Sequence, residues 1–262
     1  MRSGKLVAAF AVLLVVSFAV MNAMPSDTLP AALLQETVLA LVAFAAVGFA
    51  IPDALKCCTK SVQQRNTVRF TATALLLAGL VGGAITLLAW LFASGGTMAC
   101  FASTALSSTA DLMENLLLLL GICLLTGLYE ESFMRALGIE AFERALDTKR
   151  AILASAALFA LLHVGAPDVS AGQLVLLQTA LKFGQALLFG VILGALYVRT
   201  RRLWPCAFIH AGFDVLHMAP NVLLTGTMPE TYASGAVGDT VLLAVSVLML
   251  SGIVLKIRKE IA

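Results

Sequence analysis

Apolar runs long enough to cross a membrane dominate the chain. Each is predicted to be a helix, because about 20 apolar residues span the hydrocarbon core of a bilayer. The eight predicted spans are residues 6–24, 31–51, 70–93, 106–128, 151–164, 174–198, 203–218 and 240–255. Residues 151–164 are fewer than the core requires, so that span depends mainly on the charges around it. The pattern predicts an all-α fold, a polytopic transmembrane helix bundle of about eight spans.

Basic residues occupy every second connection between these spans. They are Arg2 and Lys5; Lys56, Lys60, Arg65 and Arg69; Arg135, Arg144, Lys149 and Arg150; Arg199, Arg201 and Arg202; and Lys256, Arg258 and Lys259. The intervening connections contain no Lys or Arg. Cytoplasmic loops are enriched in basic residues, so eight crossings place both termini in the cytoplasm. The first run resembles a secretory signal, but Met21-Asn22-Ala23 is a poor cleavage site, and a retained helix is favoured.

Composition agrees with a membrane location. Of 262 residues, 60% are hydrophobic and 12% are charged, whereas soluble domains are roughly one-quarter charged. We therefore expect a multi-pass integral membrane protein with residues 1–262 forming a single membrane domain. Its short loops and size suggest a bacterial plasma membrane. The basic residues are scattered and not gathered on one face, so the expected surroundings are the lipid bilayer, with no nucleic-acid partner.

A cluster of charges follows the fourth apolar run. In the segment Glu130-Glu131-Ser132-Phe133-Met134-Arg135, Glu131 and Arg135 are four residues apart and face each other on a helix. Glu130 points about 100° away around the same axis. We expect Glu131 and Arg135 to form an orienting ion pair and Glu130 to be the carboxylate free to accept a proton. Solvated charges at the membrane surface are the alternative.

Imidazole groups occur in two further spans. His163 lies near the end of residues 151–164, and His210 and Asp214 project four residues apart from one face of a later helix. Their distances along the helices from the basic connections are roughly 12 to 20 Å, so they reach a similar depth. A lone His163 would more often be an interhelical hydrogen bonder. Glu36 and Lys182, also within apolar runs, fit snorkelling or a polar vestibule as well as catalysis.

These motifs, in this order, resemble one membrane protease family. Glu-Glu-x-x-x-Arg, then Phe-x-x-x-His, then His-x-x-x-Asp, is similar to the CPBP family of CAAX proteases and bacteriocin-processing (ABI) proteins, which includes the Ras-converting CAAX endopeptidases. The residues around Phe189-Gly190 and Gly194 resemble the family's element before its last histidine. The resemblance covers a protease-like core at residues 116–218. Met134, Ala136, Arg201-Arg202 and Asp214 depart from the usual pattern.

The resemblance implies roles for the polar residues. Glu130 would activate a water with help from His163, and His210 with Asp214 would stabilise the oxyanion. An ionised Asp214 cannot donate a hydrogen bond, so it must be protonated or must orient His210. The same four residues, Glu130, His163, His210 and Asp214, could instead hold zinc, as the label metalloprotease implies. Metal-independent activation of water is preferred, and the cofactor remains open.

The expected function is that of a hydrolase, an intramembrane endopeptidase. Its substrate would be a membrane-associated peptide or protein, such as a prenylated peptide or a peptide precursor. No serine or cysteine lies in a nucleophile motif, which favours direct attack by water. A proton-coupled transporter is the first alternative, because membrane carboxylates and histidines also move ions. A non-catalytic membrane scaffold or immunity protein is the second.

Overall fold

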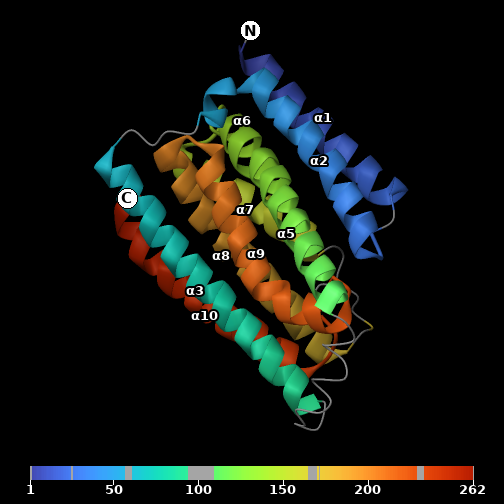
Figure 1. The fold of residues 1–262 in the computed structure, drawn as a ribbon. Coiled ribbons are helices and arrows are strands. Elements are labelled where there is room, and N and C mark those ends of the chain that lie inside the picture. The colour runs from blue at the N-terminus through green and yellow to red at the C-terminus, as the bar shows by residue number, and fades with distance from the viewer. Residues whose placement is uncertain are drawn as a thin grey trace.

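The computed structural model describes residues 2–24, 26–56, 61–93, 109–164, 170, 172–228 and 233–261. Within these ranges the regular elements are all helical and none is a strand (Figure 1), which confirms the all-α prediction. The start of the fourth predicted span, residues 106–108, lies outside the described residues. So do parts of the four connections predicted to lack basic residues.

The long helices match the predicted spans. They are α1 (Arg2–Ala23), α2 (Leu29–Ala50), α3 (Val62–Ala93), α5 (Thr109–Glu131), α7 (Thr148–Val164), α8 (Gln173–Thr200), α9 (Leu203–Thr225) and α10 (Val237–Ile261). In the described chain, seven helical segments are long and apolar enough to cross a membrane. The exception is α7, whose 17 residues rise only about 25 Å. The span predicted at 151–164 is therefore a helix that falls short of the core thickness.

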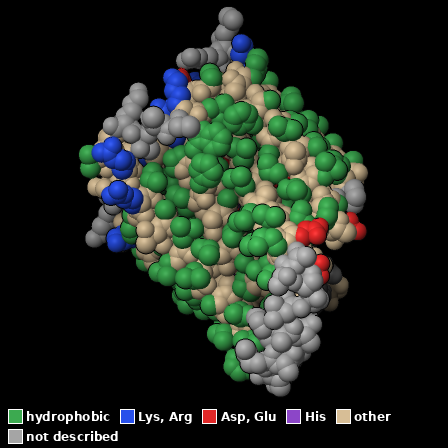
Figure 2. All heavy atoms as spheres, in the orientation of Figure 1, with side chains coloured by type: hydrophobic (Ala, Val, Ile, Leu, Met, Phe, Trp, Pro, Cys, Tyr) green, Lys and Arg blue, Asp and Glu red, His purple; other side chains and the backbone are tan. Residues whose placement is uncertain are grey.

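The helices lie alongside one another in a slanted bundle (Figure 1). The first helix begins and the last helix ends at the same end of this bundle. Figure 2 shows Lys and Arg side chains gathered towards that end, while apolar side chains cover much of the flank. We call it the basic end. This grouping agrees with the alternation of basic connections; the assignment of this end to the cytoplasm stays a prediction.

Close helix contacts bring separate spans to one place. Helix α9 packs against both α5 and α3, and α7 packs against α8. Glycines permit two of these approaches: a Cβ at Gly127 of α5 would lie 2.6 Å from the Ala207 carbonyl oxygen of α9, and a Cβ at Gly190 of α8 would lie 2.9 Å from the Ala156 Cβ of α7. Small residues at helix interfaces allow such backbone contact in membranes.

Helix α5 continues without a break into two further elements. The π-helix η2 (Ser132–Ile139) follows it directly, and the short helix α6 (Glu140–Phe142) follows η2. The continuous helical path ends at Phe142. π-Turns inside α-helices are rare and occur often at functional sites. This π-helix begins directly after Glu130 and Glu131. It therefore determines how the side chains that follow, including Arg135, are oriented relative to the two glutamates.

Candidate active site

A fully buried ion pair forms the base of the site. The Arg135 Nε lies 3.1 Å from the Glu131 Oε2, and both side chains are 0% exposed. The predicted pair is therefore present. The Arg135 guanidinium also lies over the Phe159 ring, 4.5 Å from its centroid. Among the described residues none of its three nitrogens has a well-aligned hydrogen-bond acceptor, so the ion pair and the ring are its main interactions.

The second oxygen of Glu131 links α5 to α9. Its Oε1 lies 2.8 Å from the His210 Nδ1. A carboxylate oxygen accepts, so the Nδ1–H of His210 donates this hydrogen bond. The sequence predicted Arg135 as the partner of Glu131 and did not predict His210. The bond fixes the orientation of the imidazole ring and directs its Nε2 away from Glu131.

Two other carboxylates surround that Nε2. The Asp214 Oδ2 lies 3.3 Å from it, and the Glu130 Oε2 lies 3.5 Å from it. The His210 and Asp214 side chains thus share one face of α9, as their spacing predicted. When the ring is doubly protonated, both of its N–H groups have carboxylate acceptors. Asp214 is placed to accept a hydrogen bond from His210 and to orient it.

His163 approaches Glu130 from α7. Its Nδ1 lies 2.9 Å from the Phe159 carbonyl oxygen, so the Nδ1 carries the proton and donates to that oxygen. The Nε2 then carries a lone pair and lies 3.9 Å from the Glu130 Oε1. That distance is too long for a direct hydrogen bond and suits a bridging water. The His163 and Glu130 side chains are 28% and 20% exposed, so molecules can reach the space between them.

An aromatic layer holds the two histidines, and the sequence had given it no role. Phe159 stacks close to His163, with ring centroids 4.2 Å apart. Phe189 meets His210 edge-on at 4.8 Å and also contacts Phe213. The available signal was spacing, because Phe159 precedes His163 by four residues and shares its helix face. These rings restrict the imidazoles and exclude water from one side of the site.

Two further charges interact with the cluster. The Lys182 Nζ donates to the Gln185 Oε1 at 3.1 Å and interacts electrostatically with Asp214 and Glu130. Glu36 interacts electrostatically with Asp214 and bonds to Thr126. The sequence left both charges open between snorkelling and a polar vestibule. Their electrostatic interactions with the cluster favour the vestibule.

The predicted zinc ligands do not form a ligand set in this arrangement. No group of three or more His, Cys, Asp or Glu side chains in the described ranges is placed to hold a metal ion. The His210 Nδ1 is bonded to Glu131, and the His163 Nδ1 is bonded to a backbone carbonyl.

The cluster gathers residues from four elements of the chain, which are α5, η2, α7 and α9. Glu130, His163, His210 and Asp214 come from α5, α7 and α9, and Glu131 and Arg135 support them from α5 and η2. The structure thus brings together all six predicted residues. The Glu130 carboxylate can accept a proton from water, and the neighbouring His210 imidazole can donate a hydrogen bond. Both functions are needed for hydrolysis.

Comparison with known proteins supports the same reading. Residues 112–216 match the family described as type II CAAX prenyl endopeptidase Rce1-like. No curated protein matches the chain. The matched segment runs from α5 into α9 and includes all six residues of the cluster. It confirms the resemblance to CAAX proteases and supports an intramembrane CAAX-type protease in general. Over residues 112–216, the chain is thus similar to the Rce1-like type II CAAX prenyl endopeptidase family.

Proposed function

We propose that this protein is an intramembrane endopeptidase that hydrolyses a peptide bond with a water activated by Glu130. One observation carries the proposal. The Glu130 carboxylate lies between two imidazoles, with Oε1 3.9 Å from the His163 Nε2 and Oε2 3.5 Å from the His210 Nε2. A carboxylate within a membrane span needs a partner or a wet cavity. The partly buried Glu130 has two imidazole partners, and its side chain is 20% exposed.

The attacking water would sit between Glu130 and His163. It would donate one hydrogen bond to the Glu130 Oε1 and one to the lone pair of the His163 Nε2. Glu130 would take the proton as the water oxygen attacks the peptide carbonyl, and would later give that proton to the leaving amine. Positioned acid–base groups of this kind contribute about 10²- to 10⁴-fold in rate.

His210 would stabilise the oxyanion of the tetrahedral intermediate. Its Nε2 carries the nearest side-chain N–H to Glu130 on the side opposite His163. Glu131 would hold the ring through the Nδ1–H. The single Nε2–H, from which Asp214 accepts a hydrogen bond before substrate binds, would then donate to the oxyanion. Asp214 would therefore orient His210 and would not itself donate to the oxyanion. A single preorganised donor of this type contributes about 3–4 kcal/mol.

The proposed substrate is a membrane-associated peptide or protein. The description of the matched family names prenyl endopeptidases, which makes a peptide with a prenylated cysteine near its C-terminus the first substrate to assay. Peptide precursors without a prenyl group are the second class. We further propose that residues 1–262 form one membrane domain around a core at 116–218, in a bacterial plasma membrane.

The test compares two Glu-to-Gln variants on the same helix. Glu130→Gln removes the proposed base, and hydrolysis of a fluorogenic prenylated peptide in proteoliposomes should fall at least about 10²-fold. Glu114→Gln, an exposed position on α5, serves as the matched control and should keep parental activity. Equal rates for parent and Glu130→Gln would refute the proposed role of Glu130.

Two further measurements separate the alternatives. Hydrolysis by the parent protein should persist after chelation, and complete loss that zinc restores would assign the water activation to a metal. Proton flux into the same proteoliposomes should be no greater than in empty vesicles. Flux that disappears in Glu130→Gln, without any peptide cleavage by the parent, would favour the transporter.

A further inference from the structure

A hollow at the basic end has no place in the proposed chemistry. It has a volume of about 540 Å³ and lies where the start of α3 meets the ends of α8 and α10. We call it the α3–α8–α10 pocket. Its lining residues are Gln63, Asn66, Thr67, Phe70, Arg199 and Lys256. Two of them are cations and three are uncharged polar residues, and among the described residues no carboxylate lines the pocket.

The cations reach the pocket from two different helices. Arg199 lies in the last turn of α8, and Lys256 lies near the end of α10, where its Nζ is 4.5 Å from the centroid of the Phe70 ring. The side chains of Gln63, Asn66 and Thr67 come from the first two turns of α3. Thr67 donates its hydroxyl proton to the Gln63 carbonyl oxygen at 3.1 Å, so the uncharged donors that remain for an anion are the side-chain amides of Gln63 and Asn66.

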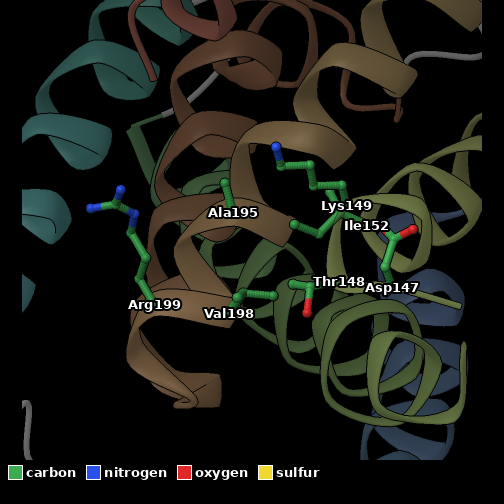
Figure 3. Close-up of a pocket in the computed structure, with 7 residues that line it drawn as sticks. All are labelled: Asp147, Thr148, Lys149, Ile152, Ala195, Val198 and Arg199. Carbon is green, nitrogen blue, oxygen red and sulfur yellow. The ribbon is translucent and has the colours of Figure 1, made fainter. Parts of the chain in front are cut away.

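A neighbouring hollow provides a comparison. It lies between α7 and α8, has a volume of about 450 Å³, and shares Arg199 as a lining residue. Figure 3 shows the Arg199 side chain directed away from Lys149 and Asp147 of this second hollow. Asp147 introduces a carboxylate there, 3.3 Å from Arg150. The α3–α8–α10 pocket is therefore the better anion site of the two.

We propose that the α3–α8–α10 pocket binds the phosphate group of an anionic phospholipid. Basic residues are common at the cytoplasmic end of membrane helices, but here they line a concave space together with two side-chain amides. Phosphate oxygens accept hydrogen bonds from amides and from Lys and Arg. Basic pockets between transmembrane helices bind such headgroups. The lipid phosphate, already at this depth, needs no extraction from water.

The experiment measures lipid retention by native mass spectrometry. The full-length protein is released from vesicles of phosphatidylcholine with added phosphatidylglycerol. We expect the parent to retain phosphatidylglycerol, and Lys256→Gln and the double variant Arg199→Gln/Lys256→Gln to bind it progressively more weakly, with at least a tenfold loss in the double variant. Thermal unfolding in phosphatidylcholine alone checks that the variants remain folded. The single variant Lys256→Gln changes an exposed side chain, so it keeps the test valid if the double variant is unstable.

A matched control is available at the same end of the bundle. Lys5 lies over the Phe49 ring with its Nζ 5.0 Å from the centroid, and neither residue lines the pocket. Lys5→Gln therefore removes an equal charge and an equivalent ring contact, and should retain phosphatidylglycerol as the parent does. Equal retention by the parent and the double variant would overturn the proposal, as would an equal loss in Lys5→Gln.

A second arm distinguishes a lipid headgroup from free phosphate. Inorganic phosphate is added to the protein in phosphatidylcholine vesicles, and thermal unfolding is recorded. We expect no shift at millimolar phosphate and a clear upward shift with phosphatidylglycerol, because only the lipid is held at this depth by its acyl chains. A phosphate shift that is lost in the double variant would overturn the lipid assignment and make the pocket a site for a soluble phosphate.

Discussion

Two arginine–glutamate pairs in this protein solve different physical problems. Arg135 and Glu131 are fully buried and share one contact of 3.1 Å. Arg201 has a side chain that is 42% exposed, yet it makes two hydrogen bonds to Glu143, at 2.7 and 2.9 Å, and one to Glu140 at 2.7 Å. Breaking the pair with more hydrogen bonds should thus cost less free energy, because water can replace its partners. The buried pair has no such substitute.

The two pairs also connect different parts of the fold. Arg201 occupies the left-handed turn after α8, with φ 48°, and ties that turn to Glu143 and Glu140 around α6. Tyr197 and Thr148 donate to the same two glutamates. This network fastens helices at the basic end. The Arg135 pair instead orients His210 through Glu131, so disrupting the pair should lower the rate of peptide hydrolysis.

Arg135→Met should have the largest effect on stability. It leaves the Glu131 carboxylate buried without its cation, which typically costs about 3–5 kcal/mol. We expect that loss in the free energy of unfolding, measured in mixed micelles, and a loss of peptidase activity with it. Adding Glu131→Gln to Arg135→Met should recover much of the stability, because the unpaired charge is then gone. A cost below about 1 kcal/mol for the single variant would contradict the burial argument.

Gly127→Ala tests the helix approach on which the Glu131–His210 hydrogen bond depends. The new Cβ would lie 2.6 Å from the Ala207 carbonyl oxygen, so α5 and α9 must separate, at a cost of about 1–3 kcal/mol. Separation would also stretch the Glu131–His210 hydrogen bond and lower activity. Gly252→Ala on α10 is the control, because nothing lies within 4 Å of its added Cβ. Matching losses in both variants would show that packing against α9 is not the cause.

Arg201→Gln should have a smaller effect than either of these changes. Partly exposed ion pairs contribute about 0–1 kcal/mol, and the bidentate geometry places this one towards the upper value. We expect a fall of that size in the free energy of unfolding and an unchanged rate of peptide hydrolysis. A loss of activity without a loss of stability would mean that the network at the basic end reaches the site.

Acid should remove the contribution of Arg201 gradually. Hydrogen bonds from Arg201 lower the pKa of Glu143 below its usual value, against the effect of partial burial, and Thr148 lowers it further. The stabilisation is therefore complete above the unfolded pKa of about 4.3 and is lost as the pH falls through the lower folded pKa. Unfolding free energies of the parent and Arg201→Gln should converge as the pH falls from about 6 to 3. A constant difference across this range would contradict the coupling.

Local spacing predicted the parts of the fold and site that depend on one helix. The apolar runs located the helices, and four-residue spacing predicted the contacts of Glu131 with Arg135 and of His210 with Asp214. The apolar pattern did not predict the beginning of α3, because its first eight residues, 62–69, are largely polar and include Arg65 and Arg69. The length of that helix follows from packing and not from composition.

Contacts between helices could not be predicted in this way. The Glu131–His210 hydrogen bond joins residues 79 positions apart, and its existence depends on the close approach of α5 to α9. The water-sized gap between Glu130 and His163 likewise depends on how α7 is placed. Phe159 and Phe189 were marked only as motif positions, because sequence does not tell which rings contact an imidazole and which contact lipid.

The π-helix η2 has a consequence for how this molecule can vary. Residues before it pack mainly against α9 and α2, while η2 itself packs most against α7 and α1. The wider turn of the π-helix allows the helical segments before and after it to face different directions around the helix axis. Loss of a single residue within Ser132–Ile139 would turn everything beyond it by about 100° relative to Glu130. Insertions and deletions should thus be rarer in these eight residues than side-chain replacements. In homologous chains, the length of this segment should vary less than its residue types.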